Sequence, residues 1–409
     1  MRVDAVIAGA GIAGIATAWK VADRLGETNA LIVDPRAPLT LTSDRPEANY
    51  RNWWPHPAMV ALADRSIDLV EGLLAAGASI AMNRRGYLYV TADQATVDGF
   101  PERIARYAAA GLGPDAAEVI VDSVALRERF PHLALDIRGA IHALRAGSLD
   151  TVGLGRAMLD RASARGVRVL TGEVVGLEVS GGRVAGVRVS IDERIESIET
   201  PAFVNAAGPF AARVARAIGV NLLIETVLRQ KVLLRDSRHV IPRASPFTIG
   251  LDARDGLPPG VHIKPDDSVV PDGVKLGWAV DQTAIEPVAS PACPPEYPRH
   301  VLERAATLVP GLEAYLDGDL PIVAHDGGFY ARTPDGLPLI GPSGPSGAYT
   351  VSGLAGFGAM LAPGAGELAA GWLLGEASTE AAAALDPRRF DGHDPSTLHA
   401  GDRATTGEL

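Results

Sequence analysis

The chain of 409 residues is acidic, with a formal net charge of −11 at pH 7, and 47% of its residues are apolar. This charge argues against a nucleic-acid-binding surface, and no unbroken apolar run approaches the roughly 20 residues of a membrane-spanning helix. The length predicts two structural domains. The sole cysteine, Cys293, excludes an internal disulfide and a cysteine metal cluster, and we expect no metal. The single cysteine and the lack of a signal-peptide pattern predict a cytoplasmic protein.

The N-terminal stretch carries the strongest pattern. An apolar run at residues 3–8 predicts a strand, and Gly9, Gly11 and Gly14 follow it with the spacing G-x-G-x-x-G. A periodic apolar segment then predicts a helix, and a second apolar run ends on Asp34. In a βαβ unit these glycines permit a tight turn, close approach of a pyrophosphate and close helix packing, while the acid accepts hydrogen bonds from ribose. We therefore expect a dinucleotide site at the helix N-terminus.

The contacts expected in this first stretch are Gly9, Gly11, Ile12, Ala13, Gly14 and Asp34. The irregular loop at residues 35–50 is expected to pass along the cofactor, with contacts from Pro35, Arg36, Thr42 and Ser43. The segment YRNWW follows at residues 50–54. Its tryptophans suit core packing, but a second interpretation is that Arg51 and its aromatic neighbours reach the face of a bound ring.

Further elements follow in chain order from apolar spacing. Helices are predicted at residues 59–74, 102–110, 122–130, 147–165, 210–218, 298–308 and 360–374. Strands are predicted at residues 86–92, 140–143, 166–173, 181–189, 202–207, 324–333 and 349–353, with further β-rich segments between 225 and 280. The strands at 166–173 and 181–189 are interpreted as neighbours joined by a Gly-Gly turn. The polar stretch from about residue 387 predicts a mobile tail.

Two later motifs indicate the kind of dinucleotide. VNAAGPFA at residues 204–211 resembles the strand end of flavoproteins. TPDGLPLIG at residues 333–341, followed by GLAGFGA at 353–359, resembles the C-terminal flavin-binding signature of the D-amino-acid oxidase superfamily. The resemblance spans residues 3–375, is strongest to the glycine oxidase and monomeric sarcosine oxidase branch, and implies FAD. A purely NAD-linked dehydrogenase would have no use for the two C-terminal turns.

The resemblance implies an α/β (α+β) fold: a Rossmann-like FAD-binding domain of the glutathione-reductase type, with an inserted, mainly antiparallel β-sheet substrate domain. The FAD-binding domain is expected at residues 1–80, 145–224 and 320–385, and the substrate domain at 81–144 and 225–319, with the tail at 386–409. Further FAD contacts are expected at Val174, Ala206, Ala207, Gly208, Gly353, Leu354, Ala355, Gly356, Phe357, Gly358, Ala359 and Met360. In such a fold the N-terminus of the last helix stabilises the anionic reduced flavin.

The resemblance also implies catalytic residues. Lys275, in VKLGWAV, occupies the place of a lysine that lies beside the flavin and helps oxygen accept electrons. Lysine is rare in this chain, which otherwise uses arginine, and this favours a functional role. Tyr330 matches a tyrosine of the substrate cavity, and Arg51 falls near an arginine close to flavin and substrate. The three histidines His56, His262 and His325 are interpreted as loop or packing residues.

The chain departs from the family pattern at several positions. Gly328 stands where the sarcosine oxidases carry the flavin-linked cysteine, so FAD is predicted to be non-covalent. The lysine that binds a substrate carboxylate is missing, and Arg332 or Arg51 is expected to replace it. Otherwise the substrate is not a simple α-amino acid. The side chains of Trp53, Trp54, Trp278, Phe357 and Met360 would form an apolar pocket suited to a bulkier amine.

The expected activity is oxidation of the C–N bond of an amine or N-substituted amino acid. Hydride transfer from the neutral amine to flavin N5 would give an imine, and oxygen would reoxidise the flavin with release of H2O2. Two alternatives stay open: a dehydrogenase that passes electrons to a quinone or an electron-transfer protein, and a flavin-binding assembly factor without turnover. The expected partners are a small-molecule substrate and an electron acceptor, with no nucleic acid and no membrane span.

Overall fold

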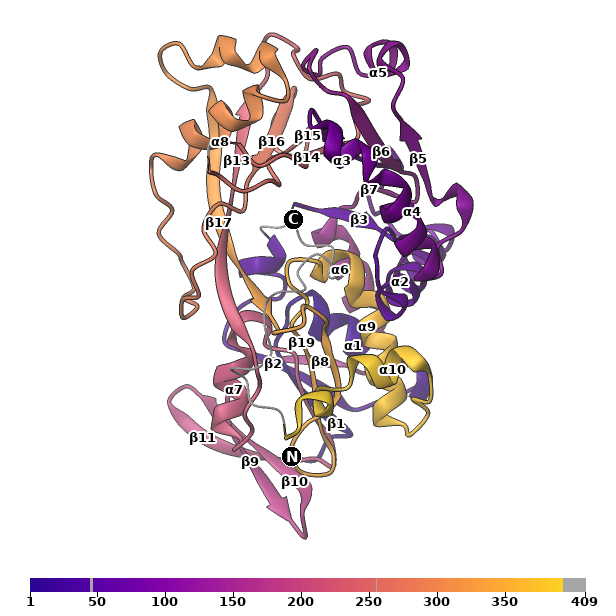
Figure 1. The fold of residues 1–409 in the computed structure, drawn as a ribbon. Helices are drawn as coiled ribbons and strands as arrows, with labels where there is room; N and C mark the ends of the chain where they lie inside the picture. Colours follow the sequence, from indigo (N-terminus) through magenta and orange to yellow (C-terminus); the bar gives the residue numbers. More distant parts are fainter. Residues whose placement is uncertain (45–46, 255, 393–409) are drawn as a thin grey trace.

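Two large sheets organise the chain in the computed structural model, which describes residues 1–44, 47–254 and 256–392 (Figure 1). The lower sheet in Figure 1 has six strands in the order β18-β19-β12-β1-β2-β8. All neighbouring pairs are parallel except β18 and β19. Its strands are β1 (Ala5–Ala8), β2 (Ala30–Asp34), β8 (Arg168–Thr171), β12 (Phe203–Asn205), β18 (Leu339–Pro342) and β19 (Ala348–Ser352).

Both faces of this sheet are buried, which explains why β1 and β2 are continuous apolar runs. Alternate residues of β1 point to opposite sides: Ala5 and Ile7 pack under the helices, whereas Val6 and Ala8 pack on a small three-stranded sheet. The helical layer consists of α1 (Ile12–Leu25), α2 (Pro57–Ala75), α6 (Thr151–Ser163) and α9 (Gly358–Leu373), with α10 (Glu380–Leu385) beside α2.

The small sheet projects at one end of the molecule (Figure 1). It is an antiparallel meander of β9 (Glu173–Ser180), β10 (Arg183–Ile191) and β11 (Arg194–Glu199). Gly181 and Gly182 join β9 to β10 with φ values of 57° and 76°, as a tight hairpin turn requires. The predicted Gly-Gly turn is therefore confirmed, but its first strand is β9; the chain at 168–171 pairs with β2 instead.

The upper sheet has eight strands in the order β17-β13-β16-β15-β14-β4-β6-β5, and every pair is antiparallel except β14 with β4. Its strands are β4 (Tyr87–Thr91), β5 (Ala117–Ile120), β6 (Gly139–Ala143), β13 (Glu225–Arg235), β14 (Phe247–Gly250), β15 (His262–Pro265), β16 (Gly273–Gly277) and β17 (Ile322–Arg332). The predicted combination of a Rossmann-like sheet and a mainly antiparallel one is confirmed.

The eight-stranded sheet has two different faces. One face forms an apolar core against α8 (Tyr297–Ala306), and its strand residues include Leu88, Val90, Val232 and Leu276. The opposite face carries aromatic and charged side chains, including those of Tyr87, Lys231 and His262, and it borders the cavity described below. The smaller helices α3 (Gln94–Asp98), α4 (Phe100–Ala109) and α5 (Ser123–Arg129) lie near β4–β6, and α7 (Ala211–Ala217) follows β12.

Three boundaries differ from the expectations. The strand β17, expected in the FAD-binding part, pairs with β13 in the eight-stranded sheet. Residues 147–148, expected to open a helix, belong to β7 (Ala146–Ser148), which pairs with β3 (Asn49–Arg51). The helix begins only after Asp150, which caps it by accepting from Gly153 N at 2.9 Å. The tail expected to be mobile is ordered as far as residue 392, since Arg389 binds Asp335 at 2.8 Å; residues 393–409 lie outside the described part.

Among the described residues no helix is long and apolar enough to cross a membrane.

We predict that Gly366 sets how closely α9 packs on α1. A Cβ at Gly366 would lie 2.4 Å from the backbone carbon of Ala16, so Gly366→Ala should destabilise the fold by about 1–3 kcal/mol. Gly371→Ala in the same helix is the matched control, because its Cβ would meet nothing closer than 3.7 Å. The control should stabilise by up to about 1 kcal/mol through helix propensity. Thermal unfolding of both variants measures this, and equal Tm values would contradict the packing argument.

Candidate functional site

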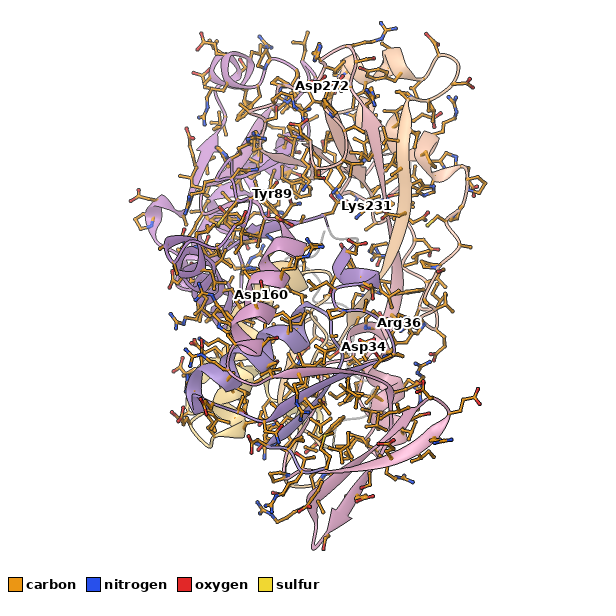
Figure 2. The ribbon with its side chains drawn as sticks, turned by 180° about the vertical axis from the view of Figure 1, so that it is seen from behind. Asp34, Arg36, Tyr89, Asp160, Lys231 and Asp272 are labelled. Carbon is orange, nitrogen blue, oxygen red and sulfur yellow. The ribbon has the colours of Figure 1, made fainter. Side chains whose placement is uncertain are left out.

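One cavity of about 500 Å³ lies between the two sheets. Its walls come from the turn before α1, the 3-10 turn Leu41–Asp44, strand β3, the end of β12, the charged face of the eight-stranded sheet and the loop before α9. Figure 2 shows Tyr89 and Lys231 on the upper part of the molecule and Asp34 and Arg36 below them. All four side chains line this cavity.

The lower end of the cavity is built by close backbone packing. Gly9 has φ 111°, and a Cβ there would lie 2.4 Å from the carbonyl oxygen of Ala206. Gly14 does not line the cavity; it lets α1 pack against the turn, because its Cβ would lie 1.9 Å from the Gly9 oxygen. No acidic side chain stands in the first turn of α1. The positive end of this helix is therefore available to an anion.

Asp34 links the glycine turn before α1 to the loop that follows β2, at the lower end of the cavity. Its carboxylate accepts from Ala10 N at 2.9 Å and from Arg36 N at 2.8 Å. Ser43 lies opposite α1 and accepts from Ile12 N at 3.1 Å. The guanidinium of Arg36 lies 5.5 Å from the ring of Phe210. This arrangement offers a carboxylate, a hydroxyl and a cation to the sugar and phosphates of a nucleotide.

A second glycine-rich loop closes the cavity before α9. Gly353, Ala355 and Gly356 all have positive φ, at 69°, 45° and 81°. Ala355 tolerates this unusual conformation because its N–H donates to Ala331 O at 3.0 Å. A Cβ on Gly356 would lie 2.1 Å from the ring of Tyr330, so only glycine fits beneath that ring. Helix α9 then begins without a side-chain cap or an acidic residue in its first turn, leaving its positive end toward the cavity.

These features fit a dinucleotide carrying a flavin. The N-termini of α1 and α9 face the cavity at its two glycine loops, and neither has a side-chain cap from its own N-cap residue. Cβ atoms added to Gly9 or Gly356 would collide with neighbouring atoms in these loops. The hydroxyl of Thr151 lines the cavity and is buried without a hydrogen-bond partner among the described residues. A buried polar atom of this kind calls for a partner supplied by a ligand. The first loop suits a pyrophosphate, and the second suits a ring that becomes negative on reduction.

Arg51 stands at the upper part of the cavity inside an aromatic cage. Its guanidinium lies 4.2 Å from the ring of Trp54 and 5.5 Å from that of Phe357. Its Nη1 donates to Tyr89 Oη at 2.8 Å and to Trp53 O at 2.9 Å. Burial raises the pKa of Tyr89 to about 12, so the phenol stays protonated at neutral pH. The cage therefore holds one fixed, buried cation at the cavity wall.

Behind this wall lies a network of buried charges. Lys275 donates to Asp266 at 2.7 Å, and Lys264, directly across the strand pair, lies 3.6 Å from the same carboxylate. Burial would raise the pKa of Asp266, but the two ammonium groups outweigh it and hold that pKa well below its usual range. Burial and the neighbouring Lys275 lower the pKa of Lys264 to about 8.

Lys231 belongs to the same sheet face but reaches the cavity itself. It lies 3.4 Å from Asp326 and opposite Gly277 of the next strand. Burial and the charge of Lys275 lower the pKa of Lys231. Thus three of the four lysines in the chain stand together on this face, and of these three only Lys231 is part of the cavity wall.

The structure brings most of the expected site residues together at this cavity. Those that line it are Gly9, Gly11, Ile12, Ala13, Asp34, Arg36, Thr42, Ser43, Arg51, Ala206, Ala207, Gly208, Tyr330 and the whole loop 353–360. Those that do not are Gly14, Pro35, Val174, Lys275 and Arg332. Val174 packs in the apolar layer under the six-stranded sheet. Arg332 donates to Glu225 and Gln282, both at 2.7 Å.

The expected apolar pocket differs from the observed one. Phe357, Met360 and Trp278 line the cavity, but Trp53 stacks on Tyr107 with ring centroids 4.3 Å apart and Trp54 is fully buried. Cavity residues that sequence reasoning missed are Glu47, Tyr87, Tyr89, Arg229, Lys231 and His262. For the residues on strands a signal was present: polar or aromatic residues alternate with apolar ones, so one sheet face is not core. Glu47 lies in the loop before β3, where no such signal exists.

His56 and His325 agree with their interpretation as loop or packing residues, whereas His262 does not. His56 caps α2 by accepting from Ala58 N at 3.2 Å. His325 stacks on Tyr297 with ring centroids 5.5 Å apart. His262 instead lines the cavity.

Comparisons with known proteins agree with this geometry. A family model described as FAD dependent oxidoreductase matches residues 4–372. The comparison with curated protein sequences finds no match. Solved structures similar to the chain include L-proline dehydrogenase from P. horikoshii, with 23% identity and TM-score 0.80, covering 95% of this chain and 98% of that one. Glycine oxidase from Geobacillus kaustophilus has 20% identity and TM-score 0.78, covering 96% and 100%. Iminodiacetate oxidase from Chelativorans sp. BNC1 has 24% identity and TM-score 0.74, covering 92% and 96%.

We predict that Asp34 contributes to FAD binding. Asp34→Ala removes the carboxylate that fastens Ala10 and Arg36, and should weaken FAD binding by about 10- to 100-fold, as the loss of a charged hydrogen-bonding group does. Titration of the apoprotein with FAD, followed by flavin fluorescence, measures the change. Asp160→Ala, on the exposed face of α6, is the control and should bind FAD like the parent. Equal affinities for both variants would remove Asp34 from the site.

Proposed function

Because the chain belongs to the family of FAD-dependent oxidoreductases, we propose that it oxidises the carbon–nitrogen bond of an amine or amino acid. When bound, FAD would supply a hydride acceptor and would pass the two electrons and protons on to oxygen, which gives H2O2. The protein contributes placement, exclusion of water and fixed charge. We further propose that FAD is held non-covalently, since Gly328 lines the cavity and offers no side chain for attachment.

The observation that carries this proposal is the position of Arg51. A buried guanidinium, only 3% exposed, stands in the same cavity as the two glycine-rich loops. Its planar fork suits a carboxylate, and burial strengthens that pairing. Arg51 thus takes the place of the missing carboxylate-binding lysine, whereas Arg332 is held outside the cavity by Glu225 and Gln282. Glycine, proline and iminodiacetate, named for the similar structures, are all amino acids with a carboxylate.

Tyr330 supports the same assignment. Its ring covers Gly356 in the second glycine-rich loop, and its strand neighbour Arg229 lies 5.8 Å from that ring. The ring therefore forms a wall between the loop and the charged sheet face. A substrate held by Arg51 would meet this wall, which keeps water from its reacting carbon.

The electron acceptor has a second candidate. The charge of Lys275 is compensated by Asp266 at 2.7 Å and its side chain lies outside the cavity wall. A cation that lies outside the cavity wall and is closely paired offers little stabilisation to superoxide in the cavity, which favours a dehydrogenase that uses a quinone or an electron-transfer protein. Lys231, which does line the cavity, is the residue that would support oxygen instead. We propose a cytoplasmic location for either activity on the basis of the single cysteine.

We predict that an amine with a carboxylate bleaches the flavin. Anaerobic titration with sarcosine, proline, glycine and N-substituted amino acids should reduce the bound FAD, followed as loss of its visible absorbance. Arg51→Lys keeps the charge but loses the fork, so KM for the carboxylate substrate should rise about tenfold or more. The KM for the corresponding amine without a carboxylate should change little. Arg65→Lys, at an exposed arginine, is the control. No bleaching by any amine would contradict the proposed reaction.

We also predict which lysine affects reoxidation by air. Lys231→Met should slow reoxidation of the reduced enzyme by about tenfold or more, because it removes a cation from the cavity wall. Lys275→Met should slow it by less than about threefold, because the Lys275 side chain lies outside the cavity wall and is paired with Asp266 at 2.7 Å, closer than the 3.4 Å between Lys231 and Asp326. Stopped-flow mixing of each reduced variant with aerated buffer gives both rates. The reverse order would restore Lys275 as the oxygen-assisting residue, and slow reoxidation of the parent would favour the dehydrogenase.

A further inference from the structure

Glu47 is a buried carboxylate in the cavity wall that the proposed reaction does not use. One of its oxygens, Oε1, lies 3.8 Å from His262 Nε2. The other, Oε2, is buried and has no hydrogen-bond partner among the described residues. The backbone carbonyl of Glu47 accepts from Lys264, and the next residue, Ala48, has φ 55°. The backbone therefore fixes where this side chain can point.

The charge state of Glu47 follows from its surroundings. Burial would raise its pKa, but His262, Lys275 and Lys264 outweigh burial and lower the pKa to about 2. Glu47 is therefore ionised at neutral pH, and an ionised carboxylate can only accept hydrogen bonds. Leaving one oxygen buried without a donor is costly. A ligand in the cavity that carries an N–H or O–H donor relieves that cost.

His262 holds Glu47 in place. Its Nδ1 lies 2.9 Å from Gly260 O and must carry a proton there, because a carbonyl oxygen can only accept. This fixes the ring so that Nε2 faces Glu47, and the contact is attractive when Nε2 is protonated as well, that is, in the imidazolium form. The ring lies over Gly277, where a Cβ would come within 2.2 Å of Nε2, and it packs 5.1 Å from the ring of Phe247. The glycine in KLGW thus provides the space for the imidazole.

We infer that Glu47 binds a protonated nitrogen of the substrate and that His262 is its positioning residue. This rests on the proposed amine oxidation and names the second group recognised. Arg51 and Glu47 lie on one short segment and line one cavity, so a carboxylate and a cationic nitrogen are met by opposite charges. A metal cation is disfavoured, because among the described residues no group of three or more His, Cys, Asp or Glu side chains could hold one. The charged groups that face Glu47 are His262, Lys264 and Lys275.

Two different groups of a substrate can supply the protonated nitrogen. It is either the amine that is oxidised, which arrives as an ammonium ion and releases its proton to water before reaction, or a second nitrogen of a diamine or basic amino acid. A carboxylate beside the reacting amine holds it protonated and slows hydride loss. A second nitrogen carries no such cost.

Binding is tested without turnover, on the FAD-loaded protein under anaerobic conditions. Isothermal titration calorimetry uses three probes: butylammonium, butane-1,4-diammonium and butyrate. Glu47→Gln, which keeps the shape but removes the charge, should weaken ammonium binding by about 10- to 100-fold and leave butyrate binding unchanged or tighter. Equal weakening of both ammonium probes assigns the reacting amine, whereas weakening of the diammonium alone assigns a second nitrogen.

Glu173→Gln is the control, because that carboxylate pairs with Arg213 on the surface and is outside the cavity. For His262, the conservative change His262→Gln keeps an N–H donor and should retain affinity within about threefold, whereas His262→Leu should lose as much as Glu47→Gln. Retained affinity in His262→Gln but not in His262→Leu would show that His262 acts through its N–H group and not only by filling space. Similar losses in both His262 variants would overturn the positioning role.

The inference is overturned if both ammonium probes bind folded Glu47→Gln within about twofold of the parent, or if neither binds the parent saturably. The proposed reaction fails separately, if no amine bleaches the flavin. Charge-dependent ammonium binding in a protein that no amine reduces would leave Glu47 as a cation site and reject only the oxidation.

Discussion

The close backbone approach at Gly9 is the constraint on which the lower half of the molecule depends. Strand β1 must turn into α1 within three residues, while the strand end at Ala206 passes against the same turn. Side chains at Gly9 or Gly14 would collide with backbone atoms, not with movable side chains. No change of side-chain rotamer can relieve such a clash, so the turn has one geometry. That geometry directs the N-terminus of α1 toward the cavity.

The upper half depends on a different principle, the two-faced sheet. Alternation sends Val232, Leu234 and Leu276 into an apolar core and Lys231 and Lys275 to the other side. Charges on that other side are buried by the six-stranded half, so each needs a partner. Among the described residues Asp266 and Asp326 supply them, at 2.7 Å from Lys275 and 3.4 Å from Lys231. Breaking one partner would leave a buried charge uncompensated.

The parts predictable from sequence were those set by local chemistry. Glycine spacing, an acid ending a strand and apolar runs identified β1, α1, β2 and the loop before α9, since each depends on neighbours in the chain. The scarcity of lysine drew attention to Lys275, whereas of the three lysines on this sheet face Lys231 is the one in the cavity wall. Which lysine reaches the cavity depends on the strand register and on Asp266, which pairs with Lys275 from outside the strand that carries it. Likewise, Gly277 and His262 are separated in sequence and meet only when β15 pairs with β16.

Pairing also explains why β17 was assigned to the wrong half. The TPDGLPLIG signature that follows β17 directly leads into β18 of the nucleotide-binding sheet, so β17 was placed with that sheet. The chain crosses from one sheet to the other within residues 333–338, between β17 and β18. Tyr330 therefore arrives from the charged sheet while Gly356 beneath it arrives from the nucleotide-binding half. The contact between them joins the two halves at the cavity, so the position of substrate-facing residues is tied to the loop that would hold the flavin.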